Sequence, residues 1–383
     1  MRVAGRAGAR LDCAMPSARR ATIVLEASAL CTPRPSGVAR YTRELAGALL
    51  ALAASGEAPY IYRLAYRLSR WTERAACLAG APRLWYQEPL PPLGLGARPA
   101  LVHGLDLRVP PWPGVPRVAT LHDVFALLSD AWSPPGFRAR KLAAYRALPV
   151  RCARIIAVSE ATRRDFLARV DCPPERVTAV HEGVSPAFAP VASVAREAAL
   201  ARHGLAGGRP YVLFVGGLDR RKNLLGLARA LAATPALAEL ALAVVGGEGH
   251  GAAELRADPV WGALGSRLRW LGAVGDAELP ALYAGAAVFC LPSFAEGFGL
   301  PLLEAMACGT PVVASDRGAL PEIAGGHARL ADPESPAAIG AALIAALAMT
   351  SAERAAARAH AASFTWERAA RATLAVYDEL LDA

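Results

Sequence analysis

The chain has 383 residues, of which 54% are hydrophobic and 20% charged; this excludes a disordered chain and favours a globular α/β protein. Two domains are expected at this length. The net charge of +9 is uneven, because residues 1–190 carry 26 Lys and Arg against 14 Asp and Glu, whereas residues 191–383 carry 16 against 19. The basic first half either attracts an anionic partner or forms an ordinary solvated face. No basic run is interleaved with aromatics, so nucleic acid is not an expected partner.

The first 20 residues contain scattered Arg without an apolar core, so we expect a disordered basic tail rather than a signal peptide. No stretch is predicted to span a membrane. The seven Cys are scattered and include no Cys-x-x-Cys pair, which argues against a disulfide framework or a zinc site. A reducing, cytoplasmic location is therefore expected.

The first predicted strand is Ala21 to Ala27, followed by a loop containing Gly37 and a helix from Val38 to Ala54. A strand, a glycine loop and a helix can hold a phosphate, although a single Gly fits an ordinary turn equally well.

A proline-rich region follows, in which four arginines recur at helical spacing together with apolar residues. They predict an amphipathic helix, either touching an anionic membrane surface or simply exposed to solvent. The residues are Arg63, Arg67, Arg70 and Arg74, with Leu64, Leu68 and Trp71.

Arg117 to Asp123 is a predicted strand that ends at His122, where parallel sheets bind ligands. A lone His at such a place is more often structural than functional. The next predicted strands are Arg154 to Val158 and Arg176 to Val180, the latter running into HEGVSPAF.

A second series of strands and helices begins at Tyr211 to Val215 and reaches Gly216 and Gly217. The chain has only two Lys and one Asn, yet Lys222 and Asn223 stand side by side. Asn223 suits the N-cap of the following helix, and Lys222 with Arg221 would form a cationic clamp for a diphosphate.

The stretch FAEGFGLPLLEAMACGTPVVAS, residues 294–315, predicts a loop, a helix over Leu302 to Cys308 and a buried strand. Glu296 precedes the helix, and Glu304 is expected in its first turn. The free N–H groups of a helix N-terminus attract phosphate, and carboxylates accept hydrogen bonds from sugar hydroxyls. The pattern therefore favours a nucleotide-sugar site over a merely capped helix.

This stretch, with two glutamates separated by seven residues, resembles the donor-binding motif of glycosyltransferase family 4, whose members are retaining enzymes of the GT-B fold. The text around HDVF, RRKN and HEGVSPAF is also similar to the family. The resemblance implies two Rossmann-like, doubly wound parallel-sheet domains over residues 21–190 and 191–364. A last helix, residues 365–383, is expected to pack back across both.

The resemblance also implies roles for individual residues. His122 would orient the transferred sugar, Glu296 would hold its hydroxyls and Glu304 the ribose, while Arg221 and Lys222 bind the phosphates. The remaining implied donor-binding residues are Gly37, Gly217, Asn223, Val274, Gly297, Phe298, Gly299 and Leu300. Some members carry an additional phosphate-binding Arg where this chain has Gly217. No Asp-x-Asp motif is found, so neither a metal nor a cofactor is expected.

The implied function is retaining transfer of a hexose from a nucleoside diphosphate to a glycan or lipid-linked acceptor in cell-surface polysaccharide synthesis. GDP-mannose is favoured as donor, and the location would be the cytoplasm or the inner face of the cell membrane. A sugar-nucleotide epimerase and a non-catalytic nucleotide-binding scaffold are the alternatives. A nicotinamide-dependent oxidoreductase would need a triple-glycine turn that the chain lacks.

Overall fold

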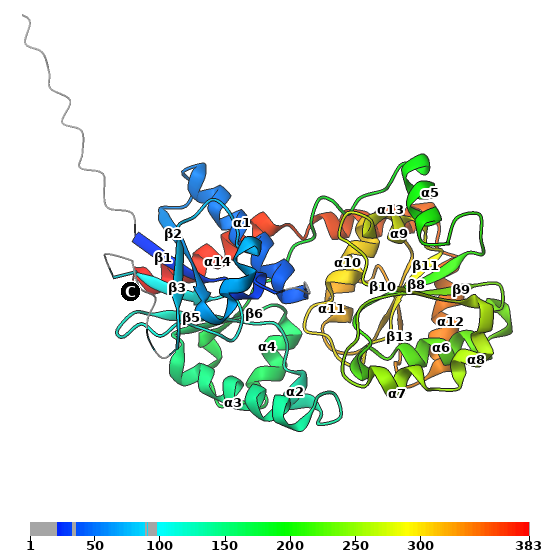
Figure 1. Cartoon of the computed structure of the whole chain (residues 1–383), viewed down its shortest axis with the longest axis horizontal. Helices are drawn as coiled ribbons and strands as arrows, with labels where there is room; N and C mark the ends of the chain where they lie inside the picture. The colour runs from blue at the N-terminus through cyan, green and yellow to red at the C-terminus, as the bar shows by residue number, and fades with distance from the viewer. Residues whose placement is uncertain (1–20, 33–35, 89, 91–97, 383) are drawn as a thin grey trace, which may run out of the picture.

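The computed structural model describes residues 21–32, 36–88, 90 and 98–382. It contains two parallel sheets flanked by helices, which lie side by side in Figure 1. The α/β class and the two doubly wound domains expected from the sequence are therefore confirmed. The predicted basic tail, residues 1–20, lies outside the described residues.

The first sheet has seven parallel strands in the order β3-β2-β1-β4-β5-β6-β7. Its central strands are mostly buried and apolar, as expected where helices cover both faces. The strands are β1 (Ala21–Glu26), β2 (Tyr60–Arg67), β3 (Arg83–Tyr86), β4 (Leu101–Gly104), β5 (Arg117–Leu121), β6 (Arg154–Ala157) and β7 (Val177–Ala179).

The second sheet has six parallel strands in the order β10-β9-β8-β11-β12-β13. The order reverses at β8, so the loops after β8 and β11 lie at the switch point where such sheets bind ligands. The strands are β8 (Tyr211–Val215), β9 (Ala241–Val245), β10 (Leu268–Gly272), β11 (Val288–Leu291), β12 (Val312–Ser315) and β13 (Arg329–Ala331).

The α-helices cover the faces of both sheets. Those of the first domain are α1 (Gly37–Ala54), α2 (Phe125–Leu128), α3 (Pro135–Arg151) and α4 (Glu160–Leu167). Those that follow are α5 (Ser193–Arg202), α6 (Leu224–Ala233), α7 (Ala252–Arg256), α8 (Val260–Leu264), α9 (Leu279–Gly285), α10 (Leu300–Ala307), α11 (Leu320–Ala324), α12 (Pro336–Leu347), α13 (Ser351–Ala362) and α14 (Trp366–Leu381).

The last helix, α14, returns from the second domain and packs on α1 of the first (Figure 1). Tyr377 on α14 is buried, and its hydroxyl lies 2.6 Å from Nδ1 of His103 on β4. The Asp378 carboxylate accepts a hydrogen bond from the hydroxyl of Tyr60. The C-terminal segment therefore completes the core of the first domain.

One predicted helix is wrong. Arg63 and Arg67 lie on strand β2, and Arg70 and Arg74 on a 3₁₀ segment, η2 (Leu68–Ala76). Tyr60, Tyr62, Leu64 and Tyr66 alternate along β2 and are buried, so the β-sheet pattern of this stretch outweighs its helical spacing of arginines. The predicted amphipathic membrane-binding helix does not exist.

No single helix in the described ranges is long and apolar enough to cross a membrane. Within these ranges, α12 and the segment α13–α14, which are bent relative to each other, together reach the required length and apolar composition.

Candidate functional site

The candidate site is formed by the loops at the carboxyl ends of the parallel strands. In the second sheet these are the loops after β8, β10 and β11, which carry Lys222, Val274 and Glu296 respectively. In the first sheet they are the loops after β4 and β5, which carry Asp106 and His122. Contacts between these two sets of loops place the carboxyl edges of the two sheets against each other.

Two cations converge on one carboxylate in the second domain. Lys222 Nζ donates to Glu296 Oε1 at 2.6 Å, and Arg221 Nη1 donates to Glu296 Oε2 at 3.2 Å. All three side chains are at least 84% buried, since 16% of Lys222, 13% of Arg221 and 9% of Glu296 is exposed. The cluster retains one positive charge, which would attract an anionic ligand.

The side chains of Glu296, Lys222 and Arg221 shift one another's pKa values. Burial alone would raise the pKa of Glu296, but the charges of Lys222 and Arg221 outweigh it and lower the pKa to about 2. Burial, reinforced by the adjacent Arg221, lowers the pKa of Lys222 although Glu296 opposes the shift. Glu296 is therefore a carboxylate at any physiological pH.

Asn223 follows the two cations in the chain, and its side chain is held by hydrogen bonds inside the protein. It caps α6 by accepting a hydrogen bond from Gly226 N, which confirms the predicted N-cap. Its φ of 54° makes it the one non-glycine residue with positive φ among those described, a conformation that Asn tolerates. Its Nδ2 donates to the carbonyls of Pro292 and Pro333. This buried side chain is fully engaged inside the protein, so the predicted direct contact with the donor is not supported.

Four backbone donors lie directly beside Glu296. Gly297, Phe298, Gly299 and Leu300 are buried, and their N–H groups have no hydrogen-bond partner within the described part of the chain. Gly299 is the N-cap of α10, with a φ of 107° that favours glycine. Since buried N–H groups are rarely left unpaired, this row indicates a place for an anionic or hydroxyl-bearing ligand.

Helix α10 begins at Leu300, earlier than predicted, so Glu304 lies in the second turn rather than the first. Its side chain is 2% exposed and crosses to the first domain. Arg40 on α1 forms ion pairs with both Glu304 and Asp276, and the hydroxyl of Tyr283 donates to Glu304 at 2.9 Å. Burial raises the pKa of Glu304, which Arg40 partly offsets. A ribose binding Glu304 would have to gain access beside Arg40.

His122 faces the site from the first domain. Its Nε2 lies 2.9 Å from the carbonyl oxygen of Leu105, and its Nδ1 lies 3.4 Å from the Glu182 carboxylate. Burial lowers the pKa of His122, but Glu182 and Leu105 outweigh it, so that the pKa is raised overall. The loop carrying His122 touches the opposite domain, since a Cβ on Gly297 would lie 1.7 Å from the His122 carbonyl oxygen.

Further contacts join the two domains at this point. The hydroxyls of Ser159 and Thr162 donate to the Gly297 carbonyl at 2.6 and 2.9 Å. The Arg221 guanidinium lies 5.0 Å from the centre of the Phe125 ring. The space left between these groups is about 10 Å³, enough for one water molecule. A ligand as large as a nucleotide-sugar therefore requires the domains to separate here.

The other predicted residues lie on the surrounding loops. Gly37 begins α1, and Gly217 and Val274 follow β8 and β10. A Cβ on Gly37 would meet nothing within 4 Å, so its own surroundings do not require glycine. The Phe298 ring packs against His181 and Phe364, so Phe298 contributes only its backbone N–H to the row of free donors.

Sequence reasoning missed Glu182 and Arg40 as site residues. Glu182 is 60 positions from its partner His122, and Arg40 is 264 positions from its partner Glu304. Only the folded chain brings these groups together.

Across the residues that the structure describes, no group of three or more His, Cys, Asp or Glu side chains could hold a metal ion. The expectation that neither metal nor cofactor is needed stays a prediction.

The comparisons with known proteins agree with this geometry. The family model Glycosyltransferase Family 4 matches residues 35–188, and the model Glycosyl transferases group 1 matches residues 209–349. The O-antigen chain mannosyltransferase B of Escherichia coli is 35% identical over 58% of this chain and 60% of its own length. This chain thus spans only about three fifths of that relative. A D-inositol 3-phosphate glycosyltransferase 1 of Catenulispora acidiphila is 34% identical over 70% of this chain and 68% of its own length.

Among solved structures, Anabaena HepE in complex with UDP and glucose is similar in fold, with a TM-score of 0.70 and 19% identity. The match covers 94% of this chain and 100% of that one. The GT-B fold is thereby confirmed. With the two family models and the relatives in agreement, the chain belongs to glycosyltransferase family 4.

Proposed function

We propose that this protein transfers a hexose from a nucleoside diphosphate to an acceptor hydroxyl, with retention at the anomeric carbon and without a metal ion. The observation that carries the proposal is the pair of cations held by Glu296 beside four unpaired N–H groups. These donors and charges would stabilise the departing diphosphate, whose charge grows as the glycosidic bond breaks. Glu296 and His122 would contact the sugar, and Glu304 the ribose.

In the proposed step, the bond between the anomeric carbon and the diphosphate oxygen breaks while the acceptor oxygen bonds to the same face of that carbon. The acceptor hydroxyl gives its proton to the departing phosphate oxygen, so no protein base is consumed. Lys222 and Arg221 act on the leaving group only, as fixed positive charges in a buried site. Closure of the domains on the bound donor would exclude water.

We further propose GDP-mannose as the donor, supported by relatives named as mannosyltransferases. The acceptor would be a glycan or a lipid-linked glycan in cell-surface polysaccharide synthesis. The buried Cys residues of the described chain form no disulfide, which fits a reducing cytoplasm. The protein would lie free in the cytoplasm or at the inner face of the membrane.

A panel of nucleotide-sugars, scored for binding and for slow hydrolysis, tests the proposal. We expect one donor to stand out, the released sugar to keep its anomeric configuration, and Glu296→Ala to lose turnover. Glu334→Gln, which changes an exposed acid of the same domain, serves as the matched control. Equal turnover in Glu296→Ala and the wild type would remove Glu296 from the site. Conversion of the donor into an epimer would replace the proposed function.

A further inference from the structure

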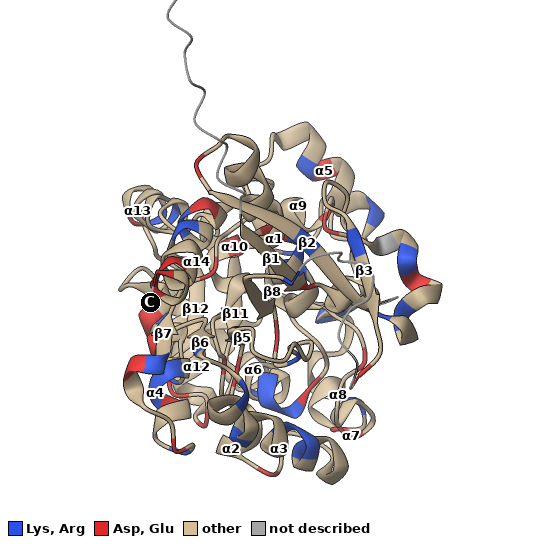
Figure 2. Ribbon diagram, turned by 90° about the vertical axis from the view of Figure 1, so that its left-hand side faces the viewer, with Lys and Arg blue, Asp and Glu red and all other residues tan. Residues whose placement is uncertain are grey.

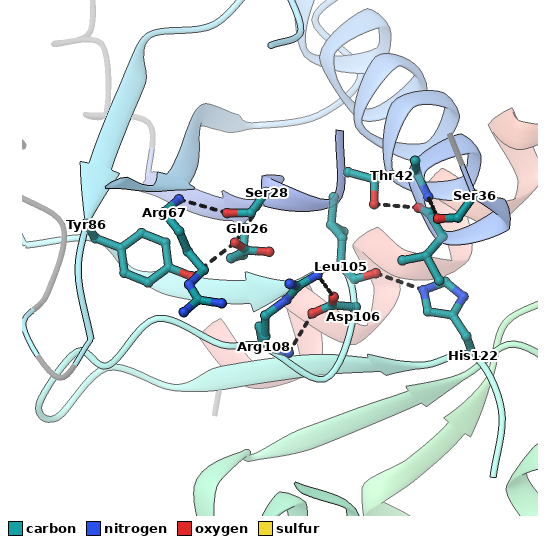
Figure 3. Close-up of polar contacts among 12 residues, drawn as sticks. Glu26, Ser28, Ser36, Thr42, Arg67, Tyr86, Leu105, Asp106, Arg108 and His122 are labelled. Atoms are coloured by element: carbon teal, nitrogen blue, oxygen red, sulfur yellow. Dashed lines mark hydrogen bonds and ion pairs between the residues drawn. The ribbon is translucent and has the colours of Figure 1, made fainter. Parts of the chain in front are cut away.

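A second, larger cavity lies at the carboxyl edge of the first sheet. It has a volume of about 740 Å³ and is lined by residues that follow β1, β4 and β5, together with η2 and α3. A cavity of several hundred Å³ accommodates a ligand the size of a mono- or disaccharide derivative. Asp106 and Arg108, which line the cavity, lie between Glu26 and His122 in Figure 3.

Among the described residues, four cations from three elements line this cavity. Arg70 comes from η2, Arg108 from the loop after β4, and Arg140 and Lys141 from α3, whose basic residues are blue in Figure 2. Arg108 is paired with Asp106, but no ion pair joins Arg70, Arg140 or Lys141 to any acid in the described ranges. Gathering like charges without counter-charges costs free energy, which an anionic ligand would offset.

The acids nearby do not neutralise these cations. Asp106 and Asp123 are the acids that line the cavity within the described ranges, and Asp106 already holds Arg108. Glu26 is 1% exposed and does not line the cavity; one of its carboxylate oxygens accepts hydrogen bonds from the Tyr86 hydroxyl and the Ser28 N–H. Burial, reinforced by Asp106, raises the pKa of Glu26 to about 7, so that its charge is partly lost at neutral pH.

The large cavity adjoins the donor site at Asp123. Asp123 lines both this cavity and the narrow space beside Arg221 and Glu296, whereas Arg70, Arg140 and Lys141 line the large cavity alone. A molecule in the cavity can therefore present a hydroxyl toward Asp123 and His122 while another part of it reaches the three cations.

Resting on the function proposed above, we propose that the acceptor carries a phosphoryl group bound by Arg70, Arg140 and Lys141, with its reactive hydroxyl placed at Asp123. The phosphoryl group belongs either to a soluble sugar phosphate or to a lipid diphosphate. Both present the same oxygens to the three cations.

The test compares three acceptors of one sugar at equal concentration with the donor identified above: a methyl glycoside, the sugar 1-phosphate and a short-chain prenyl diphosphate sugar. The variant is Arg70→Gln/Arg140→Gln/Lys141→Gln, and Arg146→Gln, an exposed residue of the same helix outside the cavity lining, is the control. We expect the triple variant to raise the KM for phosphorylated acceptors at least about tenfold, given the strength of hydrogen bonds to charged groups. Arg146→Gln should match the wild type.

Transfer to the sugar 1-phosphate would identify a soluble acceptor, and transfer to the prenyl diphosphate sugar alone would identify a lipid-linked one. Either result, with the KM change, supports the proposal. A methyl glycoside used as well as both phosphorylated forms, with an unchanged KM in the triple variant, would overturn it. Nucleotide binding is measured on the same samples, so a misfolded variant is recognised. Absence of turnover with every donor would instead reject the proposed function.

Discussion

The two domains differ in whether an acid pairs with the cations at their sites. In the second domain Lys222 and Arg221 share the carboxylate of Glu296, whereas in the first-domain cavity Arg70 and Lys141 meet no acid within the described residues. The paired cations are buried and fixed, which suits a site that must stabilise charge developing in a transition state. The unpaired cations are partly exposed and suit binding of a charge already present on a ligand. The difference indicates where each substrate would lie.

The largest effect is expected where the two regions touch. Gly297→Ala would place a Cβ 1.7 Å from the His122 carbonyl oxygen, so the Gly297 backbone, whose N–H is one of the free donors, must shift or the two domains must part. Because a misplacement of about 1 Å costs about 100-fold in rate, we expect kcat/KM to fall by at least about that factor. Gly262→Ala, where a Cβ meets nothing within 4 Å, is the control. Normal activity in Gly297→Ala would show that the position of the Gly297 N–H is not critical for catalysis.

Lowering the pH tests the ion pairs of Glu296 with Lys222 and Arg221. Glu296 has a pKa lowered from 4.5 to about 2, so its ion pairs stabilise the folded state fully above pH 4.5 and lose that contribution as the pH falls toward 2. The contribution is about 3 kcal/mol, since each unit of pKa shift corresponds to about 1.4 kcal/mol. The free energy of unfolding of the wild type minus that of Glu296→Gln, followed by urea denaturation, should shrink over this window. A difference independent of pH between 6 and 3 would contradict the assigned ion pairs.

A smaller effect is expected at His122, which borders both regions. Its raised pKa means that the ion pair with Glu182 stabilises the fold below pH 6.5, and that this contribution disappears as the pH rises through the folded-state pKa. Glu182→Gln should lower the pKa of His122 in an NMR titration and destabilise the protein more at pH 6 than at pH 8. Glu175→Gln, an exposed acid near the same strand, should do neither. An unchanged His122 titration would remove Glu182 as its partner.

Local sequence was sufficient for much of the fold. β8 was predicted at its observed bounds because its apolar β-branched run is bounded by Pro210 and Gly216. The rare Lys222–Asn223 pair indicated the cationic cluster. The predicted start of α10 was two residues late because Gly299, with its positive φ, permits the helix to begin directly after it. The Arg63–Arg74 helix failed because burial of alternate tyrosines decides the state of β2.

Contacts between distant parts of the chain could not be predicted. Arg40 reaches Glu304 and Asp276 from the other domain, and Glu182 reaches His122 from the end of β7. Neither pair has a local pattern in the sequence. The cations of the large cavity likewise come together only after η2 and α3 have packed on the same sheet edge.

The most direct test of the central claim is calorimetric binding of GDP and UDP to the wild type and to Lys222→Met. If Lys222 and Arg221 seat a diphosphate beside the free N–H groups of Gly297 to Leu300, the variant should bind the preferred nucleotide about tenfold to a hundredfold more weakly, the loss expected for one charge-assisted hydrogen bond. Arg229→Gln, which changes an exposed cation on α6, should bind as the wild type does. Equal affinity of Lys222→Met and wild type would contradict a diphosphate site at this cluster.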